Sequence, residues 1–196
     1  MSWWDKLNFL KDWPQNQLNL KMLASMLEGK LGHAFLFWGP DHDYLYQLAL
    51  SFAAAINCPH KGCSTCQVCK NTIKGIHPNL LTVEADGNIL TVDKIKQIQN
   101  FCSLTSYNSQ KKIVIVKEAE RLNQEASNKF LKTLEDPPGP QCVFILLCQQ
   151  PGMLLPTIYS RCLAFEWSFD MNAENGQQFD ELELMVEAGM KRIIGQ

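Results

Sequence analysis

Four cysteines stand close together in residues 58–69, in an order that is typical of a metal site. Cys58 and Cys63 are separated by four residues, and Cys63, Cys66 and Cys69 follow with two residues between neighbours. Tetrahedral Zn²⁺ prefers four soft ligands, and each C-x-x-C turn directs two sulfurs at one point. A four-thiolate site has no open position for water or substrate. The spacing therefore predicts a structural zinc ion, not a catalytic one.

Other interpretations of this cluster are weaker. Cysteines that only fill a core would not alternate with proline, lysine, glycine and serine, and a redox pair needs only two thiols. His60 and His77 are candidate substitute ligands, but each is better interpreted as a surface histidine. The other cysteines lie in apolar segments, where we expect them to pack in the core; they are Cys102, Cys142, Cys148 and Cys162.

A second candidate site begins at Gly39, directly after the apolar run at residues 34–38. A strand, a glycine and then a helix form the setting in which a G-x-x-x-x-G-K-S/T loop binds nucleotide phosphates. Here the frame places Tyr44 at the second glycine, Leu45 at the lysine and Tyr46 at the magnesium-binding hydroxyl. They supply neither the close backbone approach nor the positive charge that phosphate requires. We expect a nucleotide-binding fold with a degenerate ATP site and no bound ATP.

The predicted strand at residues 113–116 ends in Lys117 and Glu118. In ATPases with this loop, an acid at the end of that strand holds Mg²⁺. A lysine would repel the ion, so this position agrees with the degenerate loop. We interpret both residues as a solvated strand end.

Arg161 follows a short helical turn at residues 155–160 and precedes a predicted strand. An arginine presented to the γ-phosphate of a neighbouring subunit stabilises the transition state of ATP hydrolysis. By residue type alone, an ordinary surface ion pair is the favoured interpretation.

Apolar strands and amphipathic helices alternate along the chain and position these residues. The strands carry hydrophobic residues without alternation, which favours a parallel sheet covered by helices on both faces. The sequence therefore predicts an α/β, P-loop NTPase-like three-layer fold with a five-stranded parallel sheet. Expected strands are residues 34–38, 80–84, 113–116, 143–148 and 162–165, and expected helices are residues 15–28, 43–56, 93–102 and 124–135.

The domain organisation follows from these elements. We expect one nucleotide-binding-like domain over residues 1–167, with the cysteine module inserted at 58–69. Residues 168–179 have the composition of a linker, and residues 180–196 form an amphipathic helical pattern. We expect that helix either to dock on the domain or to begin a lid domain.

Composition excludes several classes of protein. With 196 residues, 46% hydrophobic and 19% charged, the chain is typical of a globular protein and not of a disordered one. A net charge of −2 is not the basic footprint of an autonomous nucleic-acid binder. An apolar segment long enough to span a membrane and a signal peptide are both lacking, so we expect a cytoplasmic protein without membrane contact.

Three stretches together resemble the bacterial DNA polymerase III clamp-loader subunits, a family of AAA+ ATPases. They are H-A-F-L-F-W-G-P at residues 33–40, N-K-F-L-K-T-L-E-D-P-P at residues 128–138 and S-R-C at residues 160–162. A four-cysteine zinc module after the phosphate-loop helix is also a property of this family. The resemblance covers about residues 15–167.

The resemblance implies roles for the candidate residues. Arg161 of the S-R-C motif would complete the ATP site of the adjacent subunit, acting in trans as an arginine finger. The lost loop lysine combined with this arginine resembles the delta prime type of subunit more than the ATP-hydrolysing gamma/tau type. The chain would then be no enzyme by itself but part of the polymerase holoenzyme. Implied partners are the gamma/tau and delta subunits and, through the complex, the sliding clamp and primed DNA.

Two departures from the family pattern stand out. Cys58 and Cys63 are closer together than in many relatives, and the sequence has no room for the family's helical lid and collar domains. Two alternatives stay open: a gamma/tau-like active ATPase with a degenerate loop, and a zinc-bearing AAA-like scaffold outside replication.

Overall fold

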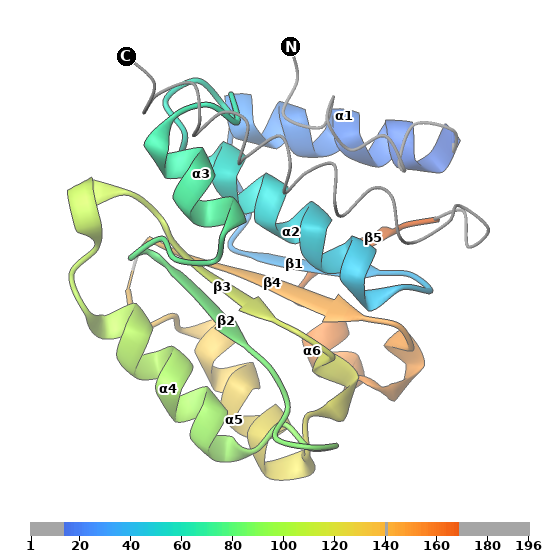
Figure 1. The fold of residues 1–196 in the computed structure, drawn as a ribbon. Helices are drawn as coiled ribbons and strands as arrows, with labels where there is room; N and C mark the ends of the chain where they lie inside the picture. The colour runs from blue at the N-terminus through green and yellow to red at the C-terminus, as the bar shows by residue number, and fades with distance from the viewer. Residues whose placement is uncertain (1–13, 140, 169–196) are drawn as a thin grey trace.

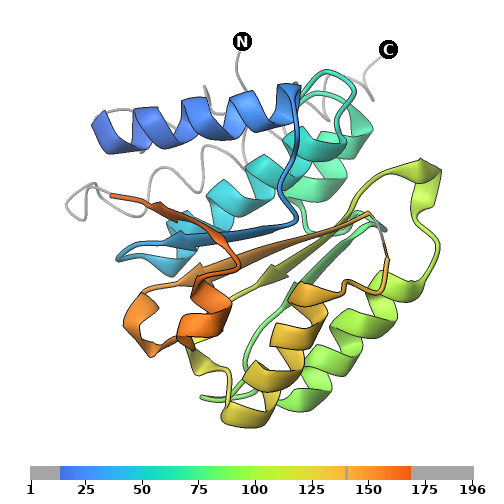
Figure 2. The same cartoon turned by 180° about the vertical axis from the view of Figure 1, so that it is seen from behind.

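The computed structural model describes residues 14–139 and 141–168, which form three layers around one sheet (Figure 1). Helices α1 (Pro14–Glu28) and α2 (His42–Asn57) cover one face, with α3 (Gln67–Ile73) packed beside α2. Helices α4 (Val92–Ser103) and α5 (Gln124–Glu135) cover the opposite face, as the view from behind also shows (Figure 2). The predicted three-layer architecture is confirmed.

The sheet has five parallel strands in the order β2-β3-β4-β1-β5. Because all strands run the same way, their carboxyl ends meet at one edge, and the segments after β1, β3 and β4 lie near one another there. The strands are β1 (Ala34–Trp38), β2 (Leu80–Val83), β3 (Lys112–Val116), β4 (Cys142–Cys148) and β5 (Leu163–Glu166).

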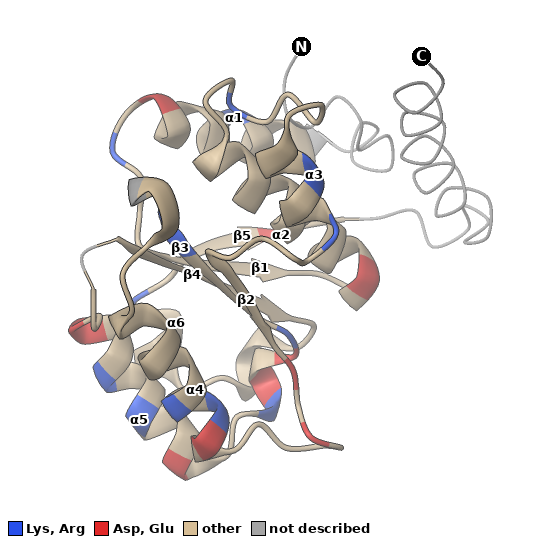
Figure 3. Ribbon diagram, turned by 60° about the vertical axis from the view of Figure 1, so that its left-hand side comes forward, with Lys and Arg blue, Asp and Glu red and all other residues tan. Residues whose placement is uncertain are grey.

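Two hydrophobic cores lie on either side of the sheet. Successive side chains of a strand point to opposite faces, so Phe35 and Phe37 join the core under α1 and α2, whereas Leu36 joins the core under α4 and α5. Every residue of β3 and β4 is buried, which explains why both strands are hydrophobic throughout apart from Lys112 at the start of β3. Figure 3 shows the charged residues on the helices and loops, with few on the sheet.

The structure differs from the expectation at short elements. Helix α3 was not predicted, because seven residues carry too little periodicity to reveal a helix. The helical turn expected before the last strand is confirmed as α6 (Pro156–Tyr159). Three 3₁₀ helices in the described part of the chain were also unforeseen: Tyr107–Ser109, Ala119–Arg121 and Pro151–Met153.

Apart from residue 168, the predicted linker at 168–179 and helix at 180–196 lie outside the described residues. Among the helices that are described, none is long and apolar enough to cross a membrane.

Candidate functional site

A side chain in the loop after β1 caps the helix that follows it. Asp41 is the N-cap of α2, and its Oδ1 accepts the backbone N–H groups of Asp43 at 2.9 Å and Tyr44 at 3.1 Å. Backbone N–H groups at a helix N-terminus are the donors that hold phosphate in an active loop. Here a carboxylate of the same chain engages two of them.

Two side chains at the motif positions are buried in the hydrophobic core. Leu45 has no exposed surface and Tyr44 is 5% exposed, and both belong to the core under α1 and α2. Leucine at the lysine position therefore packs against the sheet. A hydrophobic contact has replaced the cation.

Tyr46 and Lys117, at the two positions that would hold Mg²⁺, contact each other. The Lys117 Nζ atom lies 4.7 Å from the centroid of the Tyr46 ring and 3.2 Å from Glu84 Oε2. The Tyr46 hydroxyl lies 3.2 Å from Thr82 Oγ1. An ammonium group over a tyrosine ring forms a favourable cation–π contact. Lys117 is thus a partly exposed strand end, 26% exposed, that also contacts an acid and an aromatic ring, and not simply a solvated one.

Glu118 is also held by neighbours and is not simply solvated. Its Oε1 lies 2.8 Å from Arg121 Nη2 and 3.9 Å from His42 Nε2, and its side chain is only 22% exposed. The backbone of Glu118 has φ of 51°, in the left-handed region, at the sharp turn after β3. The carboxylate thus braces the turn against the start of α2.

A second acid joins the loop to the end of β4. Glu120 Oε1 accepts the backbone N–H of Gln149 at 2.9 Å and lies 3.6 Å from His42 Nε2. The Gln149 side chain donates to the Pro40 carbonyl at 2.7 Å. The loop, the β3 turn and the end of β4 are therefore connected by direct contacts.

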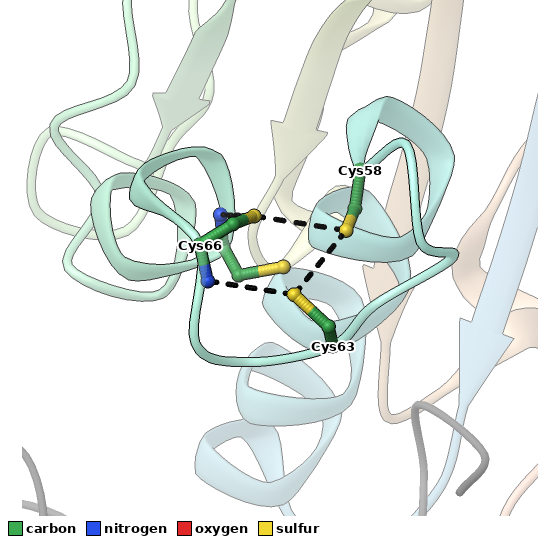
Figure 4. Close-up of side chains that lie close together, drawn as sticks. Cys58, Cys63 and Cys66 are labelled. Atoms are coloured by element: carbon green, nitrogen blue, oxygen red, sulfur yellow. Dashed lines mark hydrogen bonds between the residues drawn. The ribbon is translucent and has the colours of Figure 1, made fainter.

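The four predicted cysteines come together at the end of α2 and the start of α3. Their Sγ atoms all lie within 4.8 Å of one another, and Cys58 Sγ lies 3.7 Å from the Sγ of Cys63 and of Cys66 (Figure 4). With zinc–sulfur bonds of about 2.3 Å, neighbouring sulfurs of a tetrahedral site lie about 3.8 Å apart. The donor set and its spacing fit zinc.

The backbone around the cluster stabilises thiolates. N–H groups point at the sulfurs, from His60 to Cys58 at 3.3 Å and from Cys66 to Cys63 at 3.4 Å. The Thr65 hydroxyl, with the backbone N–H groups of Thr65 and Cys66, lowers the pKa of the Cys63 thiol to about 5. Burial raises the pKa of the Cys66 and Cys69 thiols. A bound dication would oppose this rise in the pKa values, because a thiol that coordinates a metal ion is deprotonated.

The histidines are not part of the cluster, as only the four cysteines group as ligands in the described residues. His60 is exposed, as expected, but His77 is 5% exposed, so its interpretation as a surface residue was wrong. Its Nδ1 accepts the backbone N–H of Asn79 at 3.1 Å, and burial lowers its pKa. The packing role of the other cysteines is confirmed: three are buried, and Cys162, which is partly exposed, packs against the core under α4 and α5.

Arg161 lies between α6 and β5, and its side chain is 38% exposed. Its Nη2 contacts Glu135 Oε1 at 2.5 Å, and its Nη1 donates to the Thr157 carbonyl at 3.0 Å. Glu135 belongs to the L-K-T-L-E-D-P-P stretch. Two of the motifs that carried the resemblance therefore meet in space.

A model of the family described as "DNA polymerase III, delta subunit" matches residues 15–169. The chain belongs to this family. The matched range contains the loop after β1, the cysteine module and Arg161.

Named relatives agree with this membership. The chain is 35% identical over 147 residues to DNA polymerase III subunit delta' of Bacillus subtilis, covering 73% of this chain and 44% of the relative. It is 34% identical over 149 residues to subunit delta' of Pseudomonas aeruginosa, with coverage of 72% and 45%. Subunit tau of Bacillus subtilis matches at 31% over 188 residues, covering 92% of this chain and 33% of tau. The chain thus spans between a third and about half of the length of these relatives.

Solved structures support the fold. A DNA polymerase III gamma subunit-related protein of Thermotoga maritima superposes with a TM-score of 0.60 at 23% identity, covering 87% of this chain and 56% of that one. A RuvB variant of the same organism gives 0.52 at 13% identity, with coverage of 91% and 52%. The AAA+ type of architecture expected from the sequence is confirmed.

Sequence reasoning missed several residues of these family sites. Asp41 carried a local signal, since aspartate directly before a helical pattern is a preferred N-cap. Glu135 lies in a motif that carried the resemblance, but its contact with Arg161 was not predicted. Thr82 and Gln149 carried no signal, because their contacts join segments at least 36 residues apart.

Proposed function

We propose that this chain is a delta-prime-like subunit of the DNA polymerase III clamp loader and serves DNA replication without hydrolysing ATP itself. In this role Arg161 acts in trans on ATP held by a gamma/tau-type neighbour. Family membership supports the assignment to the clamp loader. The residues in the phosphate loop support the assignment of ATP hydrolysis to the neighbouring subunit and not to this chain. Arg161 lies on the surface that would face the neighbour's ATP. The loop at Gly39, Tyr44, Leu45 and Tyr46 is an inactive ATP site.

One observation carries this proposal. The positions that would bind phosphate and Mg²⁺ are satisfied within the chain, by the Asp41 cap and by the contact of Lys117 with Tyr46. Arg161, by contrast, has a partly exposed side chain. Guanidinium is always charged and can fork onto phosphate oxygens. The chain is thus equipped to serve a neighbour's nucleotide and not its own.

The cysteine module has a structural role in this proposal. Cys58, Cys63, Cys66 and Cys69 would hold one Zn²⁺ through four thiolates, which leaves the ion closed to substrate. A bound ion cross-links the end of α2 to the start of α3. It takes no part in ATP chemistry.

The implied partners follow from the complex. We place gamma/tau and delta subunits beside this chain, with the sliding clamp and primed DNA reached through the assembly in the cytoplasm. The AAA+ domain at residues 1–167, the linker at 168–179 and the helix at 180–196 are the proposed organisation.

An ATPase with a degenerate loop is the second candidate, and the match to tau over 188 residues favours it. The buried Leu45 and the ammonium group of Lys117 weigh against it, since one removes a cation and the other repels one.

The test is Arg161→Ala in a clamp loader assembled with gamma/tau and delta subunits. We expect clamp loading and ATP turnover to fall, because arginine fingers contribute on the order of 10³–10⁵ to the rate at their own site. Arg161→Lys should also be impaired, since lysine cannot bind phosphate bidentately. Arg121→Ala is the matched control, with a side chain 37% exposed and also paired to an acid. Unchanged turnover and loading by the Arg161→Ala assembly would refute the proposal.

A further inference from the structure

The carboxylate of Glu135 orients the arginine that the proposed function places at a neighbour's ATP. We infer that Glu135 is a positioning residue: it holds the Arg161 guanidinium at one angle, with its remaining N–H groups directed outward. This inference rests on the proposed function of Arg161. It assigns to Glu135 a role in the rate of the neighbour's reaction, without contact to substrate.

The geometry around Arg161 fixes two bonds of one planar group. Glu135 Oε1 accepts from Nη2 at 2.5 Å, and the Thr157 carbonyl accepts from Nη1 at 3.0 Å. These acceptors come from different helices, α5 and α6, which pack against each other. Two acceptors on separate nitrogens prevent the fork from rotating. They use two of the five N–H donors of the guanidinium and leave the others for a phosphate.

Glu135 is badly placed for the stability of its own helix. It is the last residue of α5, where the partial negative charge of the helix end disfavours an acid, whereas Lys132 in the same turn is favourable. The acid is therefore explained by its partner and not by the helix. Pro137 and Pro138 end the helix directly afterwards, because residues before proline avoid the α conformation. The position of the helix end determines where the Glu135 carboxylate lies.

Orientation matters because long side chains sample many rotamers. A free arginine loses rotamer freedom when it binds phosphate, and an arginine already held at two points loses less. Both side chains are partly exposed, 38% for Arg161 and 45% for Glu135, so a neighbouring subunit can reach the guanidinium without opening the pair.

The experiment measures ATP turnover by an assembled loader in which only the ATPase subunit facing this chain keeps its own loop lysine. We expect Glu135→Ala to lower kcat about tenfold and to leave KM for ATP unchanged, because the arginine acts in the transition state. Glu135→Gln, which keeps an oxygen acceptor, should recover most of the rate. Asp136→Ala is the control, since it removes an exposed acid from the adjacent position and should leave kcat unchanged.

A double variant separates failure of the inference from failure of the proposed function. In an Arg161→Ala background, Glu135→Ala should cause no further loss, because residues that act as a unit are not additive. No effect of Arg161→Ala overturns the proposed function and the inference together. A large effect of Arg161→Ala with none of Glu135→Ala overturns the inference alone. The inference is also overturned if Glu135→Ala lowers kcat by the same factor in the Arg161→Ala background as in the unmodified chain.

A spectroscopic readout covers variants that assemble poorly. In the chain labelled with ¹⁵N-arginine, the Nη signals of Arg161 should be separate when rotation of the guanidinium is restricted. Glu135→Ala should merge them, and Asp136→Ala should not. Merged signals in the unmodified chain would contradict the positioning role.

Discussion

The carboxylate of Asp41 accepts the N–H groups of Asp43 and Tyr44, which are donors of the kind that hold phosphate in an active loop. Motif spacing predicts that Tyr44, Leu45 and Tyr46 do not bind a nucleotide, and the burial of Leu45 supports this prediction. The spacing did not reveal which side chains contact one another at the positions that bind a nucleotide in an active loop. Those partners come from distant strands, and the sequence does not specify which side chains meet there.

The cap itself is testable at the level of one residue. Asp41→Ala should lower the free energy of unfolding by about 1 kcal/mol, because two N–H groups at the start of α2 lose their acceptor. Urea titration followed by circular dichroism measures this loss. Asp43→Ala is the control: it removes a first-turn acid but no cap, and should cost about 0.5 kcal/mol or less in 0.15 M salt. Equal losses for both variants would show that the cap contributes nothing beyond the helix dipole.

At the scale of elements, strands and long helices were predictable and short helices were not. Helix α5 was expected at its observed bounds, because Phe130 and Leu134 repeat at helical spacing and Asp136-Pro137 ends the pattern. Helix α3 has seven residues, and Cys66 is its N-cap, whose sulfur accepts the Cys69 N–H. So short a helix is marginal by propensity alone and requires tertiary support.

We therefore expect helix α3 and the turns before it to draw support from the cysteine cluster as well as from α2. The module also contacts the main domain through the packing of α3 against α2 and through the ion pair between Lys61 and Glu28 at the end of α1. The strands are instead supported by two cores that include none of the four cysteines. Stability of the module and of the sheet should be separable.

Metal removal tests this separation. Protein purified without chelator should contain one zinc per chain, and removal of zinc with a chelator should speed amide exchange in residues 58–73. The five strands should stay protected, because their cores lie elsewhere. Cys66→Ser should lower the zinc content, whereas Cys162→Ser, outside the cluster, should not. Protein without zinc, or exchange that accelerates equally in strands and module, would contradict this assignment.

At the scale of the molecule, the parallel sheet was predictable but the strand order was not. Uninterrupted apolar strands separated by helices require parallel pairing. The strand order is β2-β3-β4-β1-β5, and in this fold Lys117 lies beside Tyr46 of the α2 helix. The same arrangement places Gln149 against Pro40. The carboxyl edge of the sheet, where a nucleotide would bind, is instead joined by contacts from three segments.

These joined contacts predict that ATP binding cannot be recovered by restoring the motif. Calorimetry with Mg-ATP should show no saturable micromolar binding to the chain, with an active gamma/tau-type subunit as the positive control. Leu45→Lys combined with Tyr46→Ser should still not bind, because Asp41 caps the helix and Lys117 still repels the metal. The variant should also lose on the order of 3 kcal/mol in the free energy of unfolding, since it replaces a fully buried leucine with an ammonium group. Saturable binding by the unmodified chain would show that the internal contacts yield to a nucleotide, and the ATPase alternative would then be favoured. Binding by the double variant alone would show that the missing lysine and hydroxyl, and not the surrounding contacts, had silenced the site.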